Sequence, residues 1–222
     1  EPKRPWYPAP MAELEKGELE ALLAQAKRQI RARMKALRSA LPPSAISARS
    51  ARIIDSLDRL PEFQRAQSVA LFWPMVSKNE IDLRALDTAL RSRDKRVFYP
   101  FMSPTEQGFH TGFRRLDRTT DLEARGRGFM EPPQGAPEAA RGDVDLVIVP
   151  ALAASADGYR IGYGIGFYDV TLPDVCPPAV SVIVALSFQL LAELPHDQHD
   201  FACDWVVTDE RFIDARSARA PA

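Results

Sequence analysis

Apolar residues at the start of the chain recur with helical spacing. Between Met11 and Leu41 they fall at steps of three and four, which predicts one apolar stripe along a helix. The residues of this stripe are Leu19, Leu22, Leu23, Ala26, Ile30, Met34, Leu37 and Leu41. Pro42 and Pro43 follow, and proline ends a helix because it lacks the amide hydrogen. A second helix is expected from Ser44 to Leu60, with Ser44 as its N-cap.

After Pro61 short apolar runs alternate with polar segments. The predicted elements are strands at 68–73, 96–101, 109–116, 144–150, 178–186 and 204–208, helices at 83–93 and 188–194, and a Gly- and Pro-rich loop at 126–142. Apart from Asp145 and Ser181, the runs at 144–150 and 178–186 are continuously apolar, which is typical of strands buried on both faces. The pattern therefore predicts an α/β fold, a mostly parallel sheet with helices on both faces.

Length and the proline distribution suggest how the chain is organised. Its 222 residues suffice for one large domain or two small ones. Four of the first ten residues are proline, and no apolar core of a secretory signal is present among them. We expect a disordered leader over residues 1–12 and a single α/β domain over 13–222.

Composition narrows the class of partner. The formal net charge is −1, so the chain as a whole does not attract nucleic acid or an anionic membrane. No apolar run approaches the roughly 20 residues that span a bilayer. The two cysteines, Cys176 and Cys203, lack zinc-type spacing and fit a reducing compartment. We therefore expect a cytoplasmic monomer that acts on small molecules.

The stretch Gly158–Asp169 reads GYRIGYGIGFYD and follows a predicted buried strand. In open α/β sheets, ligands bind beyond the carboxyl ends of such strands. Gly162, Gly164 and Gly166 allow a ligand to approach peptide N–H groups, which can form a nest for an anion, and Arg160 adds a forked donor. The spacing matches neither the Walker A motif nor the dinucleotide fingerprint. A tight turn with no ligand remains the alternative.

Basic residues of the first helix offer a second anion-binding element. At about 100° per residue, Lys27, Arg31 and Arg38 fall within roughly 40° of one another beside the apolar stripe. This strip is expected to face a cleft or, alternatively, to be a solvated flank of the helix.

Two acids follow predicted strands. Asp169 ends the glycine-rich stretch, and Asp200 ends the loop LPHDQHD. Carboxylates at strand ends suit Mg²⁺ beside phosphate groups. His196 and His199 in the same loop leave a second interpretation open, a metal-dependent hydrolase that uses both histidines and Asp200.

The segment FWPMVSKNEID follows the first predicted strand. It contains Glu80, which is either a site residue or a solvated loop residue, and the aromatic residues Phe72 and Trp73. Aromatic residues at a strand end usually belong to the core, but they also flank flat heterocycles.

Five segments in order resemble the 5-formyltetrahydrofolate cyclo-ligase family, also called methenyltetrahydrofolate synthetases. These segments are AKRQIR, LFWPMVSKNEID, VFYP, DLVIVPALAASADGYRIGYGIGFYD and ALSFQLLAELPHDQHD. The resemblance covers about Lys27 to Thr208. It implies a fold related to ribose-phosphate isomerases and CoA transferases. It also implies conversion of ATP and 5-formyltetrahydrofolate into 5,10-methenyltetrahydrofolate, ADP and phosphate.

The resemblance further implies roles for individual positions. Catalysis would fall to Arg160, Tyr168 and Glu80, and Mg²⁺ would bind Asp169 and Asp200. ATP would be bound by Lys27, Arg31, Arg160, Ile161, Gly162, Tyr163, Gly164, Ile165, Gly166, Phe167 and Tyr168. The folate would be bound by Trp73, Glu80, Tyr163, Gly164, Ile165, Gly166 and Phe167.

The chain departs from the family pattern in two places. Ala154 and Ser155 stand where the family usually has Phe-Asp, and Tyr163 and Ile165 stand where many members have Arg, Lys or Gly. These changes keep a second hypothesis open, a paralogue that binds a nucleotide or a folate-like heterocycle without this reaction.

Overall fold

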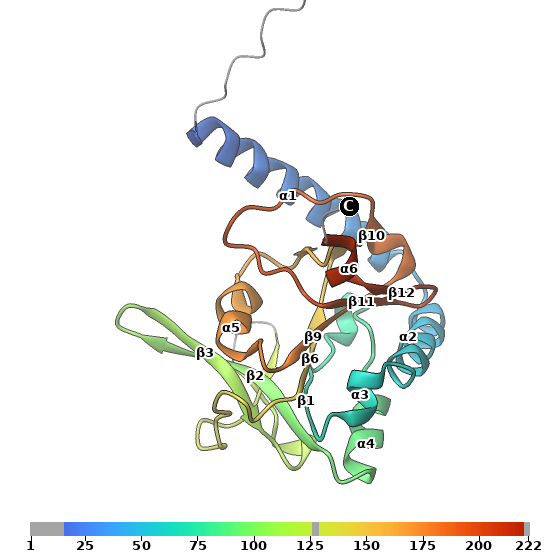
Figure 1. The fold of residues 1–222 in the computed structure, drawn as a ribbon, viewed down its shortest axis with the longest axis vertical. Coiled ribbons are helices and arrows are strands. Elements are labelled where there is room, and N and C mark those ends of the chain that lie inside the picture. The colour runs from blue at the N-terminus through green and yellow to red at the C-terminus, as the bar shows by residue number, and fades with distance from the viewer. Residues whose placement is uncertain (1–15, 126–128, 220–222) are drawn as a thin grey trace, which may run out of the picture.

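A seven-stranded sheet runs through the middle of the protein (Figure 1). The computed structural model describes residues 16–125 and 129–219, so the leader predicted at 1–12 lies outside the described residues. The strand order is β12 (Phe212–Asp214), β11 (Trp205–Thr208), β9 (Val180–Ala185), β6 (Leu146–Pro150), β1 (Ser68–Ala70), β2 (Arg96–Thr105) and β3 (Gly108–Arg115). The five inner strands are parallel, and β3 and β12 are antiparallel edges. The predicted mostly parallel α/β sheet is confirmed.

Helices cover both faces of this sheet, as predicted. One face packs against α2 (Pro43–Leu57), α3 (Pro61–Arg65) and α4 (Arg84–Ser92), and the other against α5 (Phe167–Val175) and α6 (Ala215–Arg219). In β9, Val182 and Val184 face the first group, while Ile183 and Ala185 face the second. All four are fully buried, which explains why this strand reads as a continuous apolar run rather than an alternating one.

Helix α1 (Lys16–Ser39) packs on a separate small sheet. That sheet has the order β10 (Leu190–Leu191), β7 (Ala153–Ser155) and β8 (Arg160–Ile161). Met34 of α1 is buried against Leu152, Ile161 and Leu194. The N-terminal half of α1 extends away from the body (Figure 1). The predicted helix therefore ends before Pro42 as expected, and the small sheet holds its C-terminal half.

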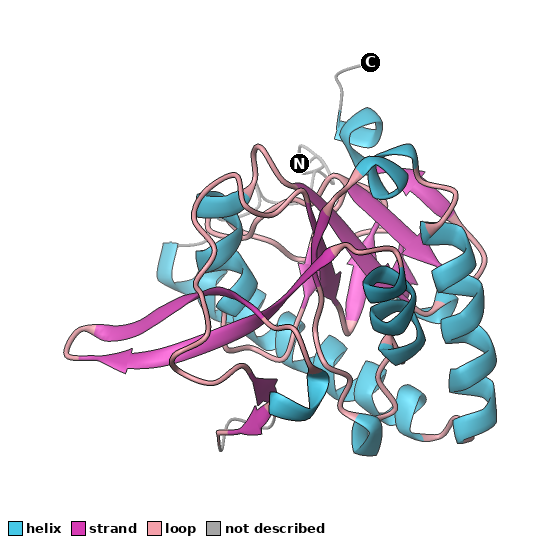
Figure 2. Cartoon of the chain, turned by 90° about the horizontal axis from the view of Figure 1, so that it is seen from below, coloured by secondary structure: helices cyan, strands magenta, loops and turns pink. Residues whose placement is uncertain are grey.

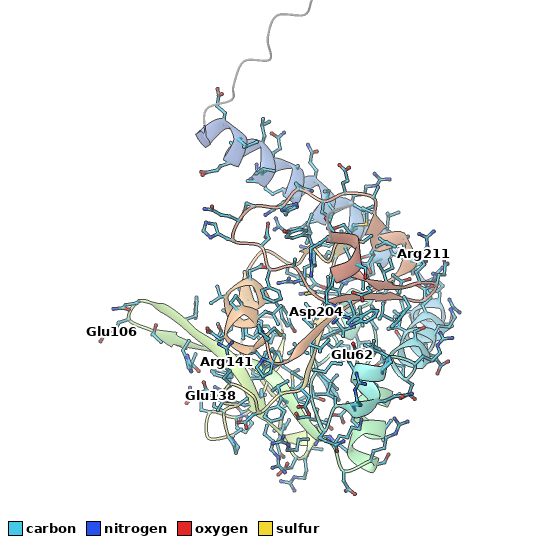
Figure 3. The ribbon with its side chains drawn as sticks, in the orientation of Figure 1. Glu62, Glu106, Glu138, Arg141, Asp204 and Arg211 are labelled. Carbon is cyan, nitrogen blue, oxygen red and sulfur yellow. The ribbon has the colours of Figure 1, made fainter. Side chains whose placement is uncertain are left out.

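A long hairpin of β2 and β3 projects beyond the rest of the molecule (Figure 2). Its tip carries Glu106, and Glu138 lies beside the hairpin nearer the body (Figure 3). The carboxylate of Glu138 lies 2.7 Å from Nε2 of His110, and its backbone bridges to Arg114. The base of the hairpin is thereby attached to the following loop.

The helix predicted at 188–194 is wrong. A 3₁₀ turn, η3 (Ser187–Gln189), leads directly into strand β10. The reason is Gln189, whose buried side chain accepts a hydrogen bond from the Leu186 N–H at 2.8 Å and donates one to the carbonyl of Leu152 at 2.8 Å. These bonds replace those of a helix, and the next two residues pair with β7.

The remaining elements refine the predicted pattern. Helix α2 ends at Leu57, and Pro61 starts a separate helix, while the residue capping α2 is Pro42 rather than Ser44. Part of the predicted 126–142 loop is strand β5 (Met130–Glu131), which pairs with β4 (Glu123–Ala124). The 3₁₀ turns η1 (Val76–Lys78) and η2 (Thr119–Asp121), like β12 and α6, were not predicted. Within the two described ranges, no helix is both long and apolar enough to cross a membrane.

Candidate active site

A cavity of about 220 Å³ lies beyond the carboxyl ends of β1 and β6. Its wall combines α1, the segment after β1, the glycine-rich stretch and the loop that ends at Asp200. Of the residues to which the family resemblance assigns a role, all except Lys27 line it: Arg31, Trp73, Glu80, Arg160, Asp169, Asp200 and residues 161–168. Of the predicted basic strip, only Arg31 lines the cavity, whereas Lys27 and Arg38 do not. Residues separated by up to 169 positions in the sequence therefore meet at one cavity.

The glycine-rich stretch forms the cavity wall where β8 leads into α5. Gly164 has φ of +101° and Gly166 has φ of +80°, a region that residues with a Cβ rarely adopt. Gly166 is the N-cap of α5, and no side chain caps this helix end. The first residues of α5, Phe167, Tyr168 and Asp169, all line the cavity. The positive end of a helix dipole thus lies at the cavity, an arrangement that favours anions.

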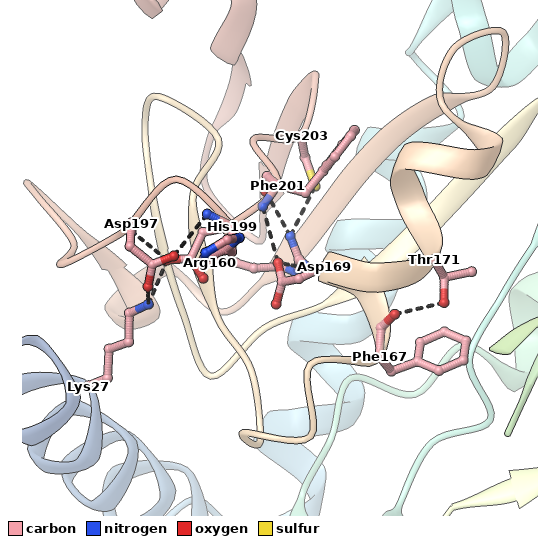
Figure 4. Close-up of polar contacts among 10 residues, drawn as sticks. Lys27, Arg160, Phe167, Asp169, Thr171, Asp197, His199, Phe201 and Cys203 are labelled. Carbon is pink, nitrogen blue, oxygen red and sulfur yellow. Dashed lines mark hydrogen bonds and ion pairs between the residues drawn. The ribbon is translucent and has the colours of Figure 1, made fainter. Parts of the chain in front are cut away.

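Arg160 is buried, and its guanidinium has partners inside the protein. Nη2 donates to Oδ1 of Asp169 at 2.8 Å, and Nη1 donates to the carbonyl of Phe201 at 2.9 Å. The Phe201 N–H in turn donates to Oδ1 of Asp169 at 3.2 Å (Figure 4). These bonds attach the segment next to Asp200 to the start of α5, so Arg160 links Asp169 to the residue that follows Asp200.

Lys27 does not line the cavity but lies directly behind Asp200. Its Nζ is 2.6 Å from Oδ2 of Asp200 and 3.0 Å from Oδ2 of Asp197 (Figure 4). Burial lowers the pKa of Lys27, but the hydrogen bonds to both acids outweigh this effect and raise the pKa overall. Arg31, one helical turn further on, donates from Nε to the carbonyl of Gly162 at 2.9 Å. The first helix is thereby attached both to the loop that ends at Asp200 and to the glycine-rich stretch.

The two predicted magnesium ligands lie on the same cavity. Asp169 and Asp200 each use one oxygen for a cation, and the other oxygens, Oδ2 of Asp169 and Oδ1 of Asp200, have no hydrogen bond to any described residue. Mg²⁺ typically takes one or two carboxylates together with phosphate oxygens and waters. The donor set therefore fits Mg²⁺ delivered with a nucleotide.

The alternative hydrolase site gains no support. Among residues 16–125 and 129–219, no group of three or more His, Cys, Asp or Glu side chains is arranged to hold a metal ion. The ring of His196 instead stacks on Tyr159, with 3.7 Å between centroids and 3° between planes.

Another part of the cavity lining is aromatic and carries a buried carboxylate. Trp73 and Phe129 line it together with Glu80. Oε2 of Glu80 accepts a hydrogen bond from the Met75 N–H at 2.7 Å, and the hydroxyl of Tyr163 is a second polar neighbour of the carboxylate. Burial raises the pKa of Glu80 despite these two neighbours. A flat heterocycle with polar edges matches such a wall.

Sequence reasoning did not identify every residue of this wall. Met75, Pro100, Phe129 and Pro150 also line the cavity. Pro100 lies within the family-like segment VFYP, which was a usable signal, whereas Phe129 lies in a predicted loop with no motif. Arg38 was noticed only as part of the basic strip, although its Nη2 donates to the Tyr163 hydroxyl.

The two departures from the family pattern have different structural settings. Ala154 and Ser155 are buried in β7 and are not among the lining residues. Tyr163 lines the cavity, and the Nζ atoms of Lys35 and Lys78 lie over its ring, 5.3 and 5.0 Å from the centroid. Two lysines from other elements thus bring positive charge to a position where many family members carry a cation.

Comparisons with known proteins agree over most of the chain. A model of the 5-formyltetrahydrofolate cyclo-ligase family matches residues 23–209. A 5-formyltetrahydrofolate cyclo-ligase of Mycolicibacterium smegmatis is 40% identical over 97 residues, which span 43% of this chain and 50% of that protein. A probable 5-formyltetrahydrofolate cyclo-ligase of Schizosaccharomyces pombe is 28% identical and covers 84% of this chain and 97% of its own length.

Solved structures give the same result. The NMR structure of a 5,10-methenyltetrahydrofolate synthetase from Aquifex aeolicus superposes with a TM-score of 0.73 at 31% identity, covering 88% of this chain and 96% of that one. A 5,10-methenyltetrahydrofolate synthetase from Mycoplasma pneumoniae gives 0.63 at 22% identity, covering 82% of this chain and 98% of that one, a likeness of fold.

Proposed function

The chain belongs to the 5-formyltetrahydrofolate cyclo-ligase family, and from this we propose that it uses ATP to convert 5-formyltetrahydrofolate into 5,10-methenyltetrahydrofolate, ADP and phosphate. The observation that carries the proposal is one cavity lined by two unlike sets of residues. One set is aromatic with a buried carboxylate, and the other combines a glycine-rich helix start with two acids. A pteridine and a triphosphate need surfaces of these two kinds.

The chemistry requires both substrates in one place. The formamide oxygen of 5-formyltetrahydrofolate is a poor leaving group. Transfer of the γ-phosphoryl group of ATP to that oxygen releases ADP, and attack of N10 on the formyl carbon then closes the ring. The C–O bond breaks and the oxygen leaves as inorganic phosphate. Positioning and charge neutralisation supply most of the catalysis in such a transfer.

The triphosphate would lie along the glycine-rich wall. The first turn of α5 has no side-chain cap, so its N–H groups are free to face an anion. Arg31 and Lys27 supply positive charge from α1. Arg160, whose donors already hold Asp169 and Phe201, would act mainly by keeping the phosphate wall in place.

Asp169 and Asp200 would hold Mg²⁺ through the oxygens that face no described partner. When bound, this ion would neutralise charge on the phosphate oxygens. Trp73 and Phe167 would flank the pteridine, and Glu80 would accept hydrogen bonds from its nitrogens, while Tyr168 borders both substrates. We expect the protein to act as a cytoplasmic monomer.

The direct test mixes the purified protein with Mg-ATP and 5-formyltetrahydrofolate and follows the absorbance of the methenyl product. ADP and phosphate should form in equal amounts with it. Glu80→Gln should abolish turnover, whereas Asp117→Asn, an exposed acid outside the cavity, should not. Folded protein that gives no ATP-dependent product would refute the proposal, and the paralogue interpretation would then stand.

A further inference from the structure

The hydroxyl of Tyr163 joins a buried arginine to a buried carboxylate. Nη2 of Arg38 donates to the Tyr163 hydroxyl, and this hydroxyl is also a polar neighbour of the Glu80 carboxylate, with which it interacts electrostatically. Arg38 and Glu80 are only 4% and 5% exposed. Buried charges are expensive unless they are paired and hydrogen-bonded, so the hydroxyl between them stabilises both.

The frame around these three residues is fixed by a neighbour. Asn79, the residue before Glu80, adopts φ of +52°, and its side-chain amide donates to the carbonyls of Arg38 and Leu41 at 3.1 and 2.9 Å. Turn η1 is thereby attached to the end of α1. The geometry of the carboxylate consequently depends on α1 as well as on its own loop.

We propose that Arg38 and Tyr163 are positioning residues that orient the Glu80 carboxylate toward the folate. Neither residue reacts in this view. Arg38 polarises the phenol, and the phenol donates to one side of the carboxylate. The Met75 N–H holds Oε2 at 2.7 Å. The proposal rests on the function proposed above and adds to it a reason for a tyrosine at position 163.

The charged and titratable side chains around Glu80 come from several elements. Arg38 projects from α1, Lys78 from η1, Tyr163 from the glycine-rich stretch and Tyr168 from α5. Burial raises the pKa of Glu80, while the Met75 N–H, the Tyr163 hydroxyl, Arg38 and Lys78 lower it. Loss of the hydroxyl leaves burial less opposed, so the carboxylate should hold its proton to higher pH.

The ring of Tyr163 serves separately from its hydroxyl. Lys35 and Lys78 lie over it, and the guanidinium of Arg38 is 5.7 Å from its centroid. Cation–π contacts of this kind hold an aromatic ring without using its oxygen. Tyr163→Phe therefore removes the proposed hydrogen bond to Glu80 and keeps the packing, which makes it the appropriate variant.

The first measurement is the pH profile of kcat/KM for 5-formyltetrahydrofolate at saturating Mg-ATP, followed as ADP release. In Tyr163→Phe the acid limb should move to higher pH, so that kcat/KM falls roughly tenfold at pH 6 and less at pH 8.5. A profile that drops by one factor at all pH values would show a structural role only and would overturn the proposal.

The second measurement does not depend on turnover. Proteins labelled with ¹³C at the glutamate side-chain carboxyl are titrated by NMR without substrate, and Glu80→Gln identifies the Glu80 signal. The midpoint for Glu80 should be higher in Tyr163→Phe and in Arg38→Met than in wild type. An unchanged midpoint in folded variants overturns the proposal even if the wild type is active. If the wild type is inactive but the Glu80 midpoint is shifted in both variants, the proposed function is refuted, whereas the influence of Arg38 and Tyr163 on Glu80 is supported.

Tyr99→Phe is the matched control. Tyr99 is fully buried and donates from its hydroxyl to Asp87 at 2.6 Å, so the substitution removes the same kind of bond outside the cavity wall. It should lower thermal stability and leave the midpoint of Glu80 unchanged. A shift as large as that of Tyr163→Phe would mean that the effect is not specific to the pair.

Discussion

Glu80 lies in the cavity wall at 5% exposure, where water solvates its charge poorly. Burial raises its pKa above the ordinary value. In the window between the unfolded and the folded pKa, the folded state binds more protons than the unfolded state. Stability therefore falls as pH rises through that window. The side chain that the function needs is unfavourable for folding near neutral pH.

Glu80→Gln should consequently stabilise the protein while removing activity. The amide keeps an acceptor for the Met75 N–H and carries no charge. We expect the unfolding temperature to rise by about 2–4 °C at pH 8, the size of change that 1 kcal/mol produces in a chain of this length. The gain should shrink below about pH 4.3, where both states of the wild type are protonated. Differential scanning calorimetry at both pH values measures this, and a gain that is independent of pH would contradict it.

Lys27 tests whether a residue behind the wall contributes to nucleotide binding. Lys27→Ala should raise the KM for ATP by roughly tenfold and leave that for the folate within about twofold. Arg28→Ala changes the same charge on the next, exposed residue of α1 and serves as control. Initial rates with each substrate varied would give the comparison, and equal effects of the two variants would remove Lys27 from the site.

At the scale of elements, the turn between β7 and β8 packs tightly against the segment before β11. Gly158 has φ of +88°, and a Cβ at this position would lie 2.2 Å from the carbonyl oxygen of Cys203. The Cys203 N–H also donates to the Gly158 carbonyl at 2.9 Å. The turn that precedes Arg160 is therefore shaped by direct contact between two backbones.

Gly158→Ala should destabilise the protein by about 2–3 kcal/mol, because strain and overpacking add. Gly162→Ala is the control, since a Cβ there meets nothing within 4 Å and its φ is ordinary. The two glycines lie in the same stretch, so a difference in urea unfolding isolates the contact. Equal stabilities would show that the turn can move away from Cys203.

Comparing the observed strands and helices with the predicted ones shows which elements can be recognised from the sequence. The apolar runs at 144–150 and 178–186 reveal strands because their central side chains, at 146–149 and 181–186, are buried. The segment at 188–194 has helical spacing as well, but the side-chain bonds of Gln189 to the backbone of Leu186 and Leu152 determine its structure. Partners 37 residues apart cannot be seen in a local pattern.

At the scale of the whole molecule, the cavity also combines residues that the sequence indicates with residues that only tertiary packing brings in. The glycine-rich stretch and the acids at 169 and 200 stand out in the sequence by their place after predicted strands, and they line one cavity. Tertiary packing places Phe129 in the lining and brings Arg38 to the hydroxyl of Tyr163, and no sequence motif indicates either contact. Sequence therefore indicates which residues carry the chemistry better than it indicates which residues support them.

Binding of Mg-ATP should rigidify distant parts of the chain together. Arg160 connects α5 to the segment at 201–203, and Lys27 connects the loop at 197–200 to α1. Hydrogen exchange followed by mass spectrometry should show slower exchange at 162–169 and at 197–203 in the complex. The tip of the β2–β3 hairpin should be unaffected. EDTA should remove the protection, and protection that persists without metal would argue against Asp169 and Asp200 as magnesium ligands.

The same hairpin gives the molecule a practical handle. Its tip at Glu106 projects beyond the body (Figure 3) and does not line the cavity, so a fluorophore, an affinity tag or a tether to a sensor surface attached there should leave the cavity unobstructed. A pair of dyes, one at this tip and one on the exposed N-terminal half of α1, would span the enzyme and report any change in the distance between the two elements during turnover.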